Sequence, residues 1–187
     1  MMFEKDTSMM QPAMILNPGP NYDLPDRPFQ GIPGIEKTKG GRLYATFYSG
    51  GADEGPDNFV VVLKSDDDGM TWSKPILAVD PAGLVRAFDP VLWHDPLGRL
   101  WLFWAQSYNK FDGRCGVWCS ICEKPDAAKP VWENPRRIAN GIMMNKPTVL
   151  TDGTWLFPTA IWADHVFPSD LNSIPEEKYS NVYASRD

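Results

Sequence analysis

The chain has 187 residues, which is enough for one domain with a hydrophobic core. Its eight Trp, 18 Pro and 15 Gly, together with few stretches of helical periodicity, predict an all-β fold with frequent turns. The net charge of −6 argues against nucleic acid or an anionic membrane as partner, and no apolar run approaches the ~20 residues of a transmembrane helix.

The first 30 residues are expected to form an irregular N-terminal arm. Residues 17–20 and 24–28 are rich in proline, which is incompatible with regular structure there. Residues 1–14 lack the basic segment followed by an apolar segment that marks a signal peptide, so none is predicted.

Residues 65–72, with the sequence Ser-Asp-Asp-Asp-Gly-Met-Thr-Trp, separate two strand-like segments at 58–64 and 74–77. Short polar side chains bond backbone N–H groups in such turns, and Gly69 can adopt a positive φ. We therefore expect a β-hairpin, with Trp72 burying its indole beside it. A calcium loop is the rival interpretation, but the helix–loop–helix register set by Gly69 lacks its glutamate ligand.

The chain repeats itself after this arm. Pro33, Pro90 and Pro147 are spaced 57 residues apart, and each stands in the first strand of a similar unit. Four short antiparallel strands in each unit are typical of propeller blades. The second strands are expected at residues 41–47, 98–104 and 153–157, the third strands at 58–64, 116–121 and 181–184, and the fourth strands at 74–77 and within 131–138.

The predicted blades cover residues 31–80, 86–139 and 141–187. The last is expected to be incomplete, because its copy of the acidic turn stops at Asp187. Propellers close with about 4–8 blades. The prediction is a partial β-propeller, with about three four-stranded antiparallel blades of about six, in a fragment of a longer protein. The alternative is a half-propeller that self-associates through its open blade edges.

Residues 65–72 fit the pattern Ser-x-Asp-x-Gly-x-Thr-Trp at every specified position. With the repeat, this turn resembles the Asp-boxes (BNR repeats) of the sialidase-like β-propeller superfamily, over about residues 28–187. The resemblance implies a carbohydrate-active protein, a glycoside hydrolase (exo-glycosidase) in its full-length form, that acts on a glycan or oligosaccharide and needs no cofactor. Relatives of this kind are often exported, so it also implies a secreted or periplasmic location.

Polar residues near the repeated prolines, and residues of the loops after each second strand, are expected to converge at the mouth of the central channel. There they would bind a sugar, whose hydroxyls need donors and acceptors and whose C–H faces stack on aromatic rings. The predicted substrate-binding residues are Gln30, Arg86, Asp89, Asn145, Lys146 and Trp162.

The resemblance places the general acid in the loop before the first Asp-box. Asp57 or Glu54 is therefore the candidate catalytic acid.

Sialidases also carry Arg-Ile-Pro where this chain has Gly31-Ile32-Pro33, and a second clamp arginine is absent from residues 48–51. We expect a sugar other than sialic acid. The alternatives are a non-catalytic carbohydrate-binding propeller and an inactive truncated fragment.

Three cysteines lie close together, at Cys115, Cys119 and Cys122. A Cys-x-x-Cys pair is compatible with redox or zinc chemistry, but there is no second pair, and His94 and His165 do not stand at zinc-finger spacing. Strand alternation places Cys119 and Cys122 on opposite faces. The sequence therefore predicts buried free thiols and no metal site.

Overall fold

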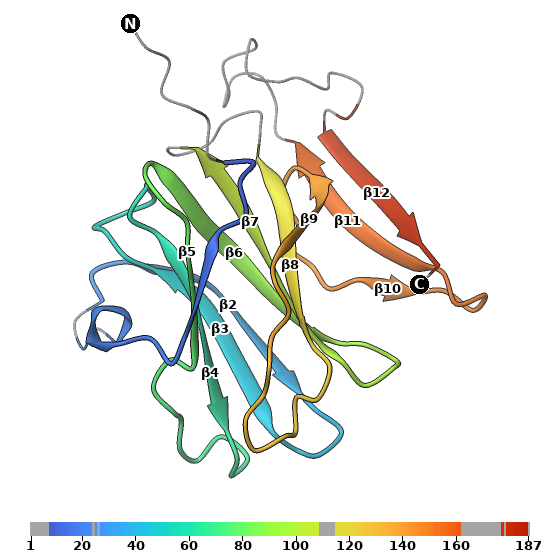
Figure 1. The fold of residues 1–187 in the computed structure, drawn as a ribbon. Coiled ribbons are helices and arrows are strands. Elements are labelled where there is room, and N and C mark those ends of the chain that lie inside the picture. Colours follow the sequence, from blue (N-terminus) through green and yellow to red (C-terminus); the bar gives the residue numbers. More distant parts are fainter. Residues whose placement is uncertain are drawn as a thin grey trace, which may run out of the picture.

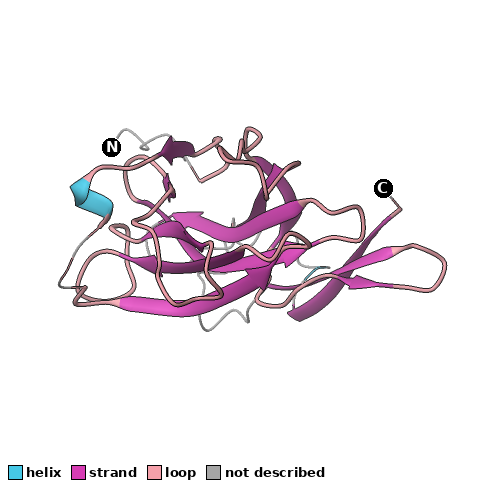
Figure 2. Cartoon of the chain, turned by 90° about the horizontal axis from the view of Figure 1, so that it is seen from below, coloured by secondary structure: helices cyan, strands magenta, loops and turns pink. Residues whose placement is uncertain are grey.

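The computed structural model describes residues 8–23, 25, 27–108, 115–161, 177 and 179–186. Strands dominate this part of the chain, and the short 3-10 turn η1 (Pro20–Tyr22) stands out among them in Figure 2. The all-β prediction is confirmed. No helix in these residues is long and apolar enough to span a membrane.

The strands form three antiparallel sheets that follow one another in chain order (Figure 1). The first sheet has the order β1-β5-β4-β3-β2, with β1 at Ala13–Leu16, β2 at Gln30–Lys37, β3 at Leu43–Ser49, β4 at Phe59–Ser65 and β5 at Leu77–Asp80. The second has the order β6-β7-β8-β9, with β6 at Val85–His94, β7 at Leu100–Tyr108, β8 at Gly116–Cys122 and β9 at Arg136–Asn140. The third has the order β10-β11-β12, with β10 at Thr148–Val149, β11 at Trp155–Ile161 and β12 at Tyr179–Ser185.

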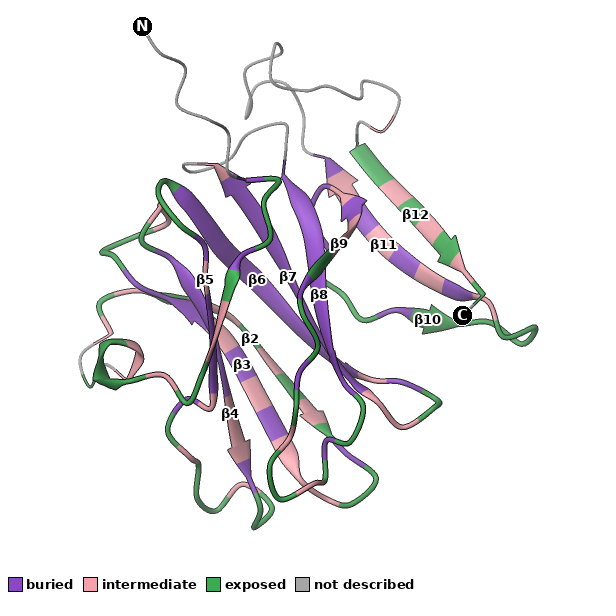
Figure 3. Ribbon diagram, viewed as in Figure 1, coloured by how far each residue is buried: buried purple, intermediate pink, exposed green. Residues whose placement is uncertain are grey.

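The second sheet is the centre of the core, because both of its faces are buried (Figure 3). Alternate side chains of its strands point to opposite faces. Phe88 and Trp104 pack toward the first sheet, whereas Trp93 and Phe103 pack toward the third. Neighbouring sheets thus bury apolar faces against each other, as blades of a propeller do.

The three cysteines are all buried thiols, as predicted. Cys119 belongs to the core between the second and third sheets, and Cys122 to the core between the first and second. Burial raises the pKa of the Cys119 thiol to about 12, so this thiol stays protonated at neutral pH. No group of three or more metal-ligating side chains is placed to hold a metal ion within the residues described.

The N-terminal segment is more regular than expected. The prediction of an irregular arm was wrong at β1, which pairs with β5 in a register running from Ala13 opposite Asp80 to Leu16 opposite Leu77. The proline-rich stretches begin only after β1, and the outer edge of β5 presents backbone groups that need partners.

After β1, the segment covers the outer face of the first sheet. Tyr22 packs edge-on against Phe59, with ring centroids 4.9 Å apart, and its hydroxyl donates to Asp80 Oδ2 at 2.7 Å. Burial, together with this carboxylate, raises the pKa of Tyr22 to about 12. The arm thus buries a face that would otherwise meet water.

The fourth strand of the first sheet begins later than predicted, at Leu77 rather than residue 74. The chain already runs beside β4 at this point, because Ser73 N donates to Lys64 O at 2.9 Å and Ile76 N donates to Val62 O at 2.8 Å. Pro75 lies between them and has no N–H to continue the ladder.

The turn between β4 and β5, at the lower end of the first sheet in Figure 1, has the geometry expected of an Asp-box. Ser65 Oγ accepts from Gly69 N at 2.9 Å and donates to Asp67 Oδ1 at 2.7 Å. The Asp67 carboxylate accepts from Thr71 N at 2.9 Å and from Thr71 Oγ1 at 2.6 Å. Gly69 has φ +85°, so this turn needs a residue without a Cβ clash.

The prediction that Trp72 buries its indole was wrong, because 39% of the residue is exposed. A Cβ at Gly69 would lie 3.8 Å from Trp72 Cζ2, which shows that the indole lies against the turn itself. The turn stands at the end of the sheet, beyond the packed faces, so the ring is covered on one side only.

Candidate functional site

The candidate site lies at the opposite end of the first sheet from the Asp-box. The loop of residues 50–58 joins β3 to β4 at this end, and β6 begins beside it. Ala87 N in β6 donates to Asn58 O at 3.1 Å, which ties the start of the second sheet to this loop. Side chains 32 residues apart in the chain, at positions 54 and 86, are thereby brought together.

Arg86 is the centre of this cluster and is fully buried. Its Nη1 lies 3.6 Å from Glu54 Oε2. Its guanidinium carbon lies 3.9 Å from the centre of the Phe88 ring and 5.6 Å from that of the Tyr48 ring. An aromatic surround and a carboxylate are the usual means of holding a buried arginine.

Glu54 is only partly exposed and has a second partner. The hydroxyl of Tyr48 donates to Glu54 Oε1 at 3.1 Å. Tyr48 is buried, and burial, followed by the charges of Asp89 and Glu54, raises the pKa of its phenol well above the usual range. Tyr48 therefore acts as a hydrogen-bond donor that orients the carboxylate.

Asp89 completes the cluster and has 6% of its surface exposed. Burial raises the pKa of its carboxyl to about 6, because the nearby Glu54 adds to the effect and Arg86 opposes it only in part. Two carboxyl groups in different environments beside one guanidinium are a common arrangement at catalytic sites.

Asp89 also lies on a backbone irregularity that the first two sheets share. β2 and β6 each carry a bulge at the repeated proline, where their pairing with the next strand shifts. The residue before that proline has a positive φ, +41° at Ile32 and +47° at Asp89. Bulges of this kind re-aim side chains and are frequent next to functional sites.

Asn58 holds the loop that carries Glu54, and the sequence analysis missed it. Its buried amide donates to Gly50 O at 2.6 Å and to Asp53 O at 3.1 Å, and it accepts from Gly55 N at 2.9 Å. A polar residue at the start of a hydrophobic strand was the available signal, since a buried amide must find partners.

The other residues predicted near Glu54 are more peripheral. Asp57 is exposed, and Gln30 is exposed at the start of β2, where it pairs with Ser49. Neither is among the partners of Arg86 or Asp89 described above. Glu54 rather than Asp57 is thus the carboxylate of this loop that contacts Arg86.

The predicted residues of the third unit lie apart from the cluster or outside the described residues. Asn145 and Lys146 are exposed, and Lys146 Nζ binds Glu36 Oε2 at 2.6 Å, near the far end of β2. Trp162 lies outside the residues that the structure describes.

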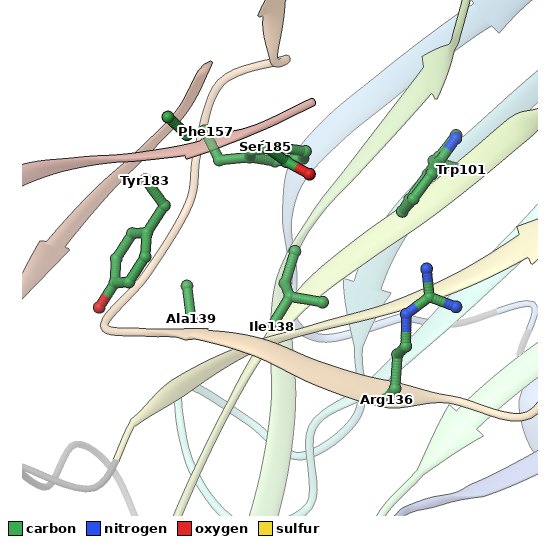
Figure 4. A pocket seen from close by; sticks show the side chains of 8 residues that line it. Trp101, Arg136, Ile138, Ala139, Phe157, Tyr183 and Ser185 are labelled. Atoms are coloured by element: carbon green, nitrogen blue, oxygen red, sulfur yellow. The ribbon is translucent and has the colours of Figure 1, made fainter. Parts of the chain in front are cut away.

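A cavity of about 360 Å³ opens between the second and third sheets (Figure 4). Trp101, Arg136 and Ile138 line one side of it, and Phe157 and Tyr183 the other. It shares no residue with the cluster at Arg86, and none of the described residues that line it carries a carboxyl group. Its lining is largely aromatic and aliphatic, as expected where two blades pack against each other.

The repeat, the Asp-box and the sheet order agree with a comparison to known families. A family model described as a BNR repeat-like domain matches residues 41–178, which is most of the chain. The chain belongs to the BNR repeat-like family. No curated protein matches this BNR repeat-like chain.

Solved structures show the same fold at low sequence identity. The Hadza microbial sialidase Hz136 aligns with a TM-score of 0.53 at 16% identity, over 69% of this chain and 32% of its own. A thermostable family-43 glycoside hydrolase aligns with a TM-score of 0.54 at 12% identity, over 83% of this chain and 54% of its own. The xylan β-1,4-xylosidase from Bacillus halodurans C-125 aligns with a TM-score of 0.51 at 18% identity, over 97% of this chain and 31% of its own.

The chain thus spans between about a third and about half of the length of these proteins. Together with the family match, the likeness identifies the fold as a partial β-propeller. The predicted fold class is therefore confirmed.

Proposed function

We propose that this BNR repeat-like protein is a glycoside hydrolase in its full-length form, with a catalytic site that includes Glu54 and Asp89. The observation that carries the proposal is the pair of unlike carboxyl groups beside Arg86. Glycosidases generally act through two carboxyl groups, one that donates a proton to the leaving oxygen and one that acts as base or nucleophile.

Asp89 is the acid in this proposal. Its carboxyl group keeps a proton up to about pH 6, because burial disfavours its charged form. A carboxylic acid that remains protonated near neutral pH can transfer its proton to the glycosidic oxygen as the bond breaks. Glu54, oriented by Tyr48 and Arg86, is the carboxylate partner.

Gln30 remains a proposed contact of the sugar beside this pair, with Trp162 as a proposed stacking ring. Asn145 and Lys146, which lie apart from the pair, remain proposed contacts of glycan units farther from it. Amide and ammonium groups supply the donors and acceptors that sugar hydroxyls need.

Kinetics of the full-length protein on a panel of aryl glycosides and oligosaccharides test the proposal. We expect Asp89→Asn and Glu54→Gln each to lower kcat by a factor of about 10² to 10⁴, the usual contribution of a general acid or base. Asp57→Asn should leave kcat within about two-fold, because its carboxyl group is exposed and outside the cluster. A large loss of kcat in Asp57→Asn alone would instead identify Asp57 as the catalytic acid.

A non-catalytic carbohydrate-binding propeller is the second candidate, and the burial of Asp89 favours it, since a catalytic acid must reach its substrate. Calorimetric binding of oligosaccharides by the full-length protein, with no turnover of any of them, would support this candidate over the hydrolase.

A further inference from the structure

The inner strand of the first sheet, β2, has no room for a side chain at position 31. A Cβ built on Gly31 would lie 2.7 Å from Tyr48 Cζ and 2.8 Å from Tyr48 Oη. Gly31 and Tyr48 are direct partners in the pairing of β2 with β3, so the phenol ring lies across the glycine. A cationic side chain therefore cannot project from this position while Tyr48 keeps its place.

Tyr48 cannot easily move away. Its ring lies 5.6 Å from that of Phe29 and 6.4 Å from that of Phe88, and its hydroxyl donates to Glu54. Because the residue is buried among these groups, a side chain at position 31 would have to displace a packed ring.

The cation that does stand at this site is already neutralised. Arg86 pairs with Glu54 and lies against two aromatic rings. Arg27, near the start of β2, pairs with Asp23 at 3.9 Å and lies over the Phe47 ring. Each described arginine at this end of the first two sheets thus has a carboxylate or a ring as partner.

The charges of the cluster add up to zero or below. Arg86 contributes one positive charge, Glu54 one negative charge, and Asp89 a second negative charge when ionised. Among the described residues of this site, an anionic ligand would face carboxylates without an uncompensated cation, and like charges brought together suppress binding.

We propose that Tyr48, by covering Gly31, and Glu54, by neutralising Arg86, make this site selective for uncharged sugars over carboxylate-bearing sugars. The inference rests on the proposed function and adds the substrate class to it. Tyr48 determines specificity through the shape of its ring, and Glu54 determines it through its negative charge.

Binding measurements separate this inference from catalysis. Calorimetry on the full-length protein would compare matched methyl glycosides of glucose with glucuronic acid and of galactose with galacturonic acid, and N-acetylneuraminic acid with its methyl ester. We expect each uncharged member to bind at least about ten-fold more tightly than its acid. Equal or tighter binding of the acids would overturn the inference, and no binding of any sugar would overturn the proposed function with it.

The variant Glu54→Gln gives the sharper test, because it removes the charge that neutralises Arg86 and keeps the shape of the side chain. The preference for the uncharged sugar should shrink by at least about ten-fold, through a gain in affinity for the acid. Tyr48→Phe, which keeps the ring over Gly31 and both charges, is the matched control and should keep the preference. An unchanged preference in Glu54→Gln, with a wild-type circular dichroism spectrum, would contradict the role given to its charge.

Discussion

Asp89 brings together three properties on a single residue: a nearly buried carboxyl group, a positive φ and two charged neighbours. The cost of burying its charge is visible in its raised pKa, which Arg86 only partly offsets. Asn tolerates a positive φ better than most residues, so Asp89→Asn removes the charge and keeps the backbone geometry.

The stability of the protein should therefore depend on pH through Asp89. A folded-state pKa of about 6, above the value of about 3.9 of an unfolded aspartate, means that Asp89 contributes full stability below about pH 4. This contribution is lost as the pH rises through 6, by roughly 3 kcal/mol in total. Among the described residues, Glu54, Arg86 and Tyr48 are the charged and titratable groups that face it.

Urea unfolding at pH 4 and pH 8 checks this expectation. The Asp89→Asn variant should lose less stability than the wild type between these two pH values. If the variant loses as much stability as the wild type between pH 4 and pH 8, the pH dependence belongs to another group.

Asn58 shows how one residue controls a loop. Asn58→Ala leaves the carbonyls of Gly50 and Asp53 and the N–H of Gly55 without their partner. We expect a loss of roughly 1–3 kcal/mol in the free energy of unfolding, the usual cost of buried polar groups left unsatisfied. Chemical denaturation measures this, with the exposed Asp57→Ala as the control that should change stability by less than about 0.5 kcal/mol.

At the scale of elements, the Asp-box turn between β4 and β5 is held by side chains rather than by packing. Thr71 and Ser65 donate to the Asp67 carboxylate and lower its pKa to about 2. Because the folded-state pKa lies below that of an unfolded aspartate, the turn gains stability above about pH 4 and loses it as the pH falls through 2.

Amide hydrogen exchange at Gly69 and Thr71 reports on this turn. Both N–H groups donate within the turn, so Asp67→Asn should speed exchange at Thr71 at pH 6. Asp68→Asn is the control, since its ion pair with Lys37 is exposed and such pairs contribute little. Equal protection of Thr71 in the wild type and in Asp67→Asn would contradict the role of the carboxylate.

At the scale of the whole molecule, the three sheets differ in how well they are covered. The second is buried on both faces, and the first is covered by η1 and β1. Among the described strands, β12 is at the edge of the third sheet, and 62% of Val182 and 68% of Tyr179 are exposed on it (Figure 3). Exposed apolar edge strands are sites of intermolecular pairing.

We propose that the chain self-associates through β12, and that a charge on this strand suppresses it. Val182→Lys should shift the sedimentation velocity distribution toward the monomer at concentrations where the wild type associates. Leu97→Lys, at an equally exposed leucine in the turn between β6 and β7, is the matched control and should leave the distribution unchanged. A monomeric wild type at all concentrations would contradict the proposal.

Much of the fold could be predicted from the sequence because its signals are local. Side chains alternate along each strand, the Asp-box makes its bonds within a few residues, and the repeated prolines set the period of the blades. The same locality explains why Cys119 and Cys122 could be assigned to opposite faces. Arg86 and Asp89 could be named as candidates for the same reason, because each stands close to a repeated proline, whereas Glu54 was named from the resemblance to sialidase-like propellers.

Other features depend on contacts between residues far apart in the chain. The pairing of β1 with β5, the exposure of Trp72 and the position of Lys146 beside Glu36 follow from which surfaces meet, and no local pattern encodes that. The same holds for the ring of Tyr48 over Gly31 and for the contact of Arg86 with Glu54, because burial and charge act between neighbours in space. Local chemistry was thus enough to predict the blades, whereas their packing against one another defined the site.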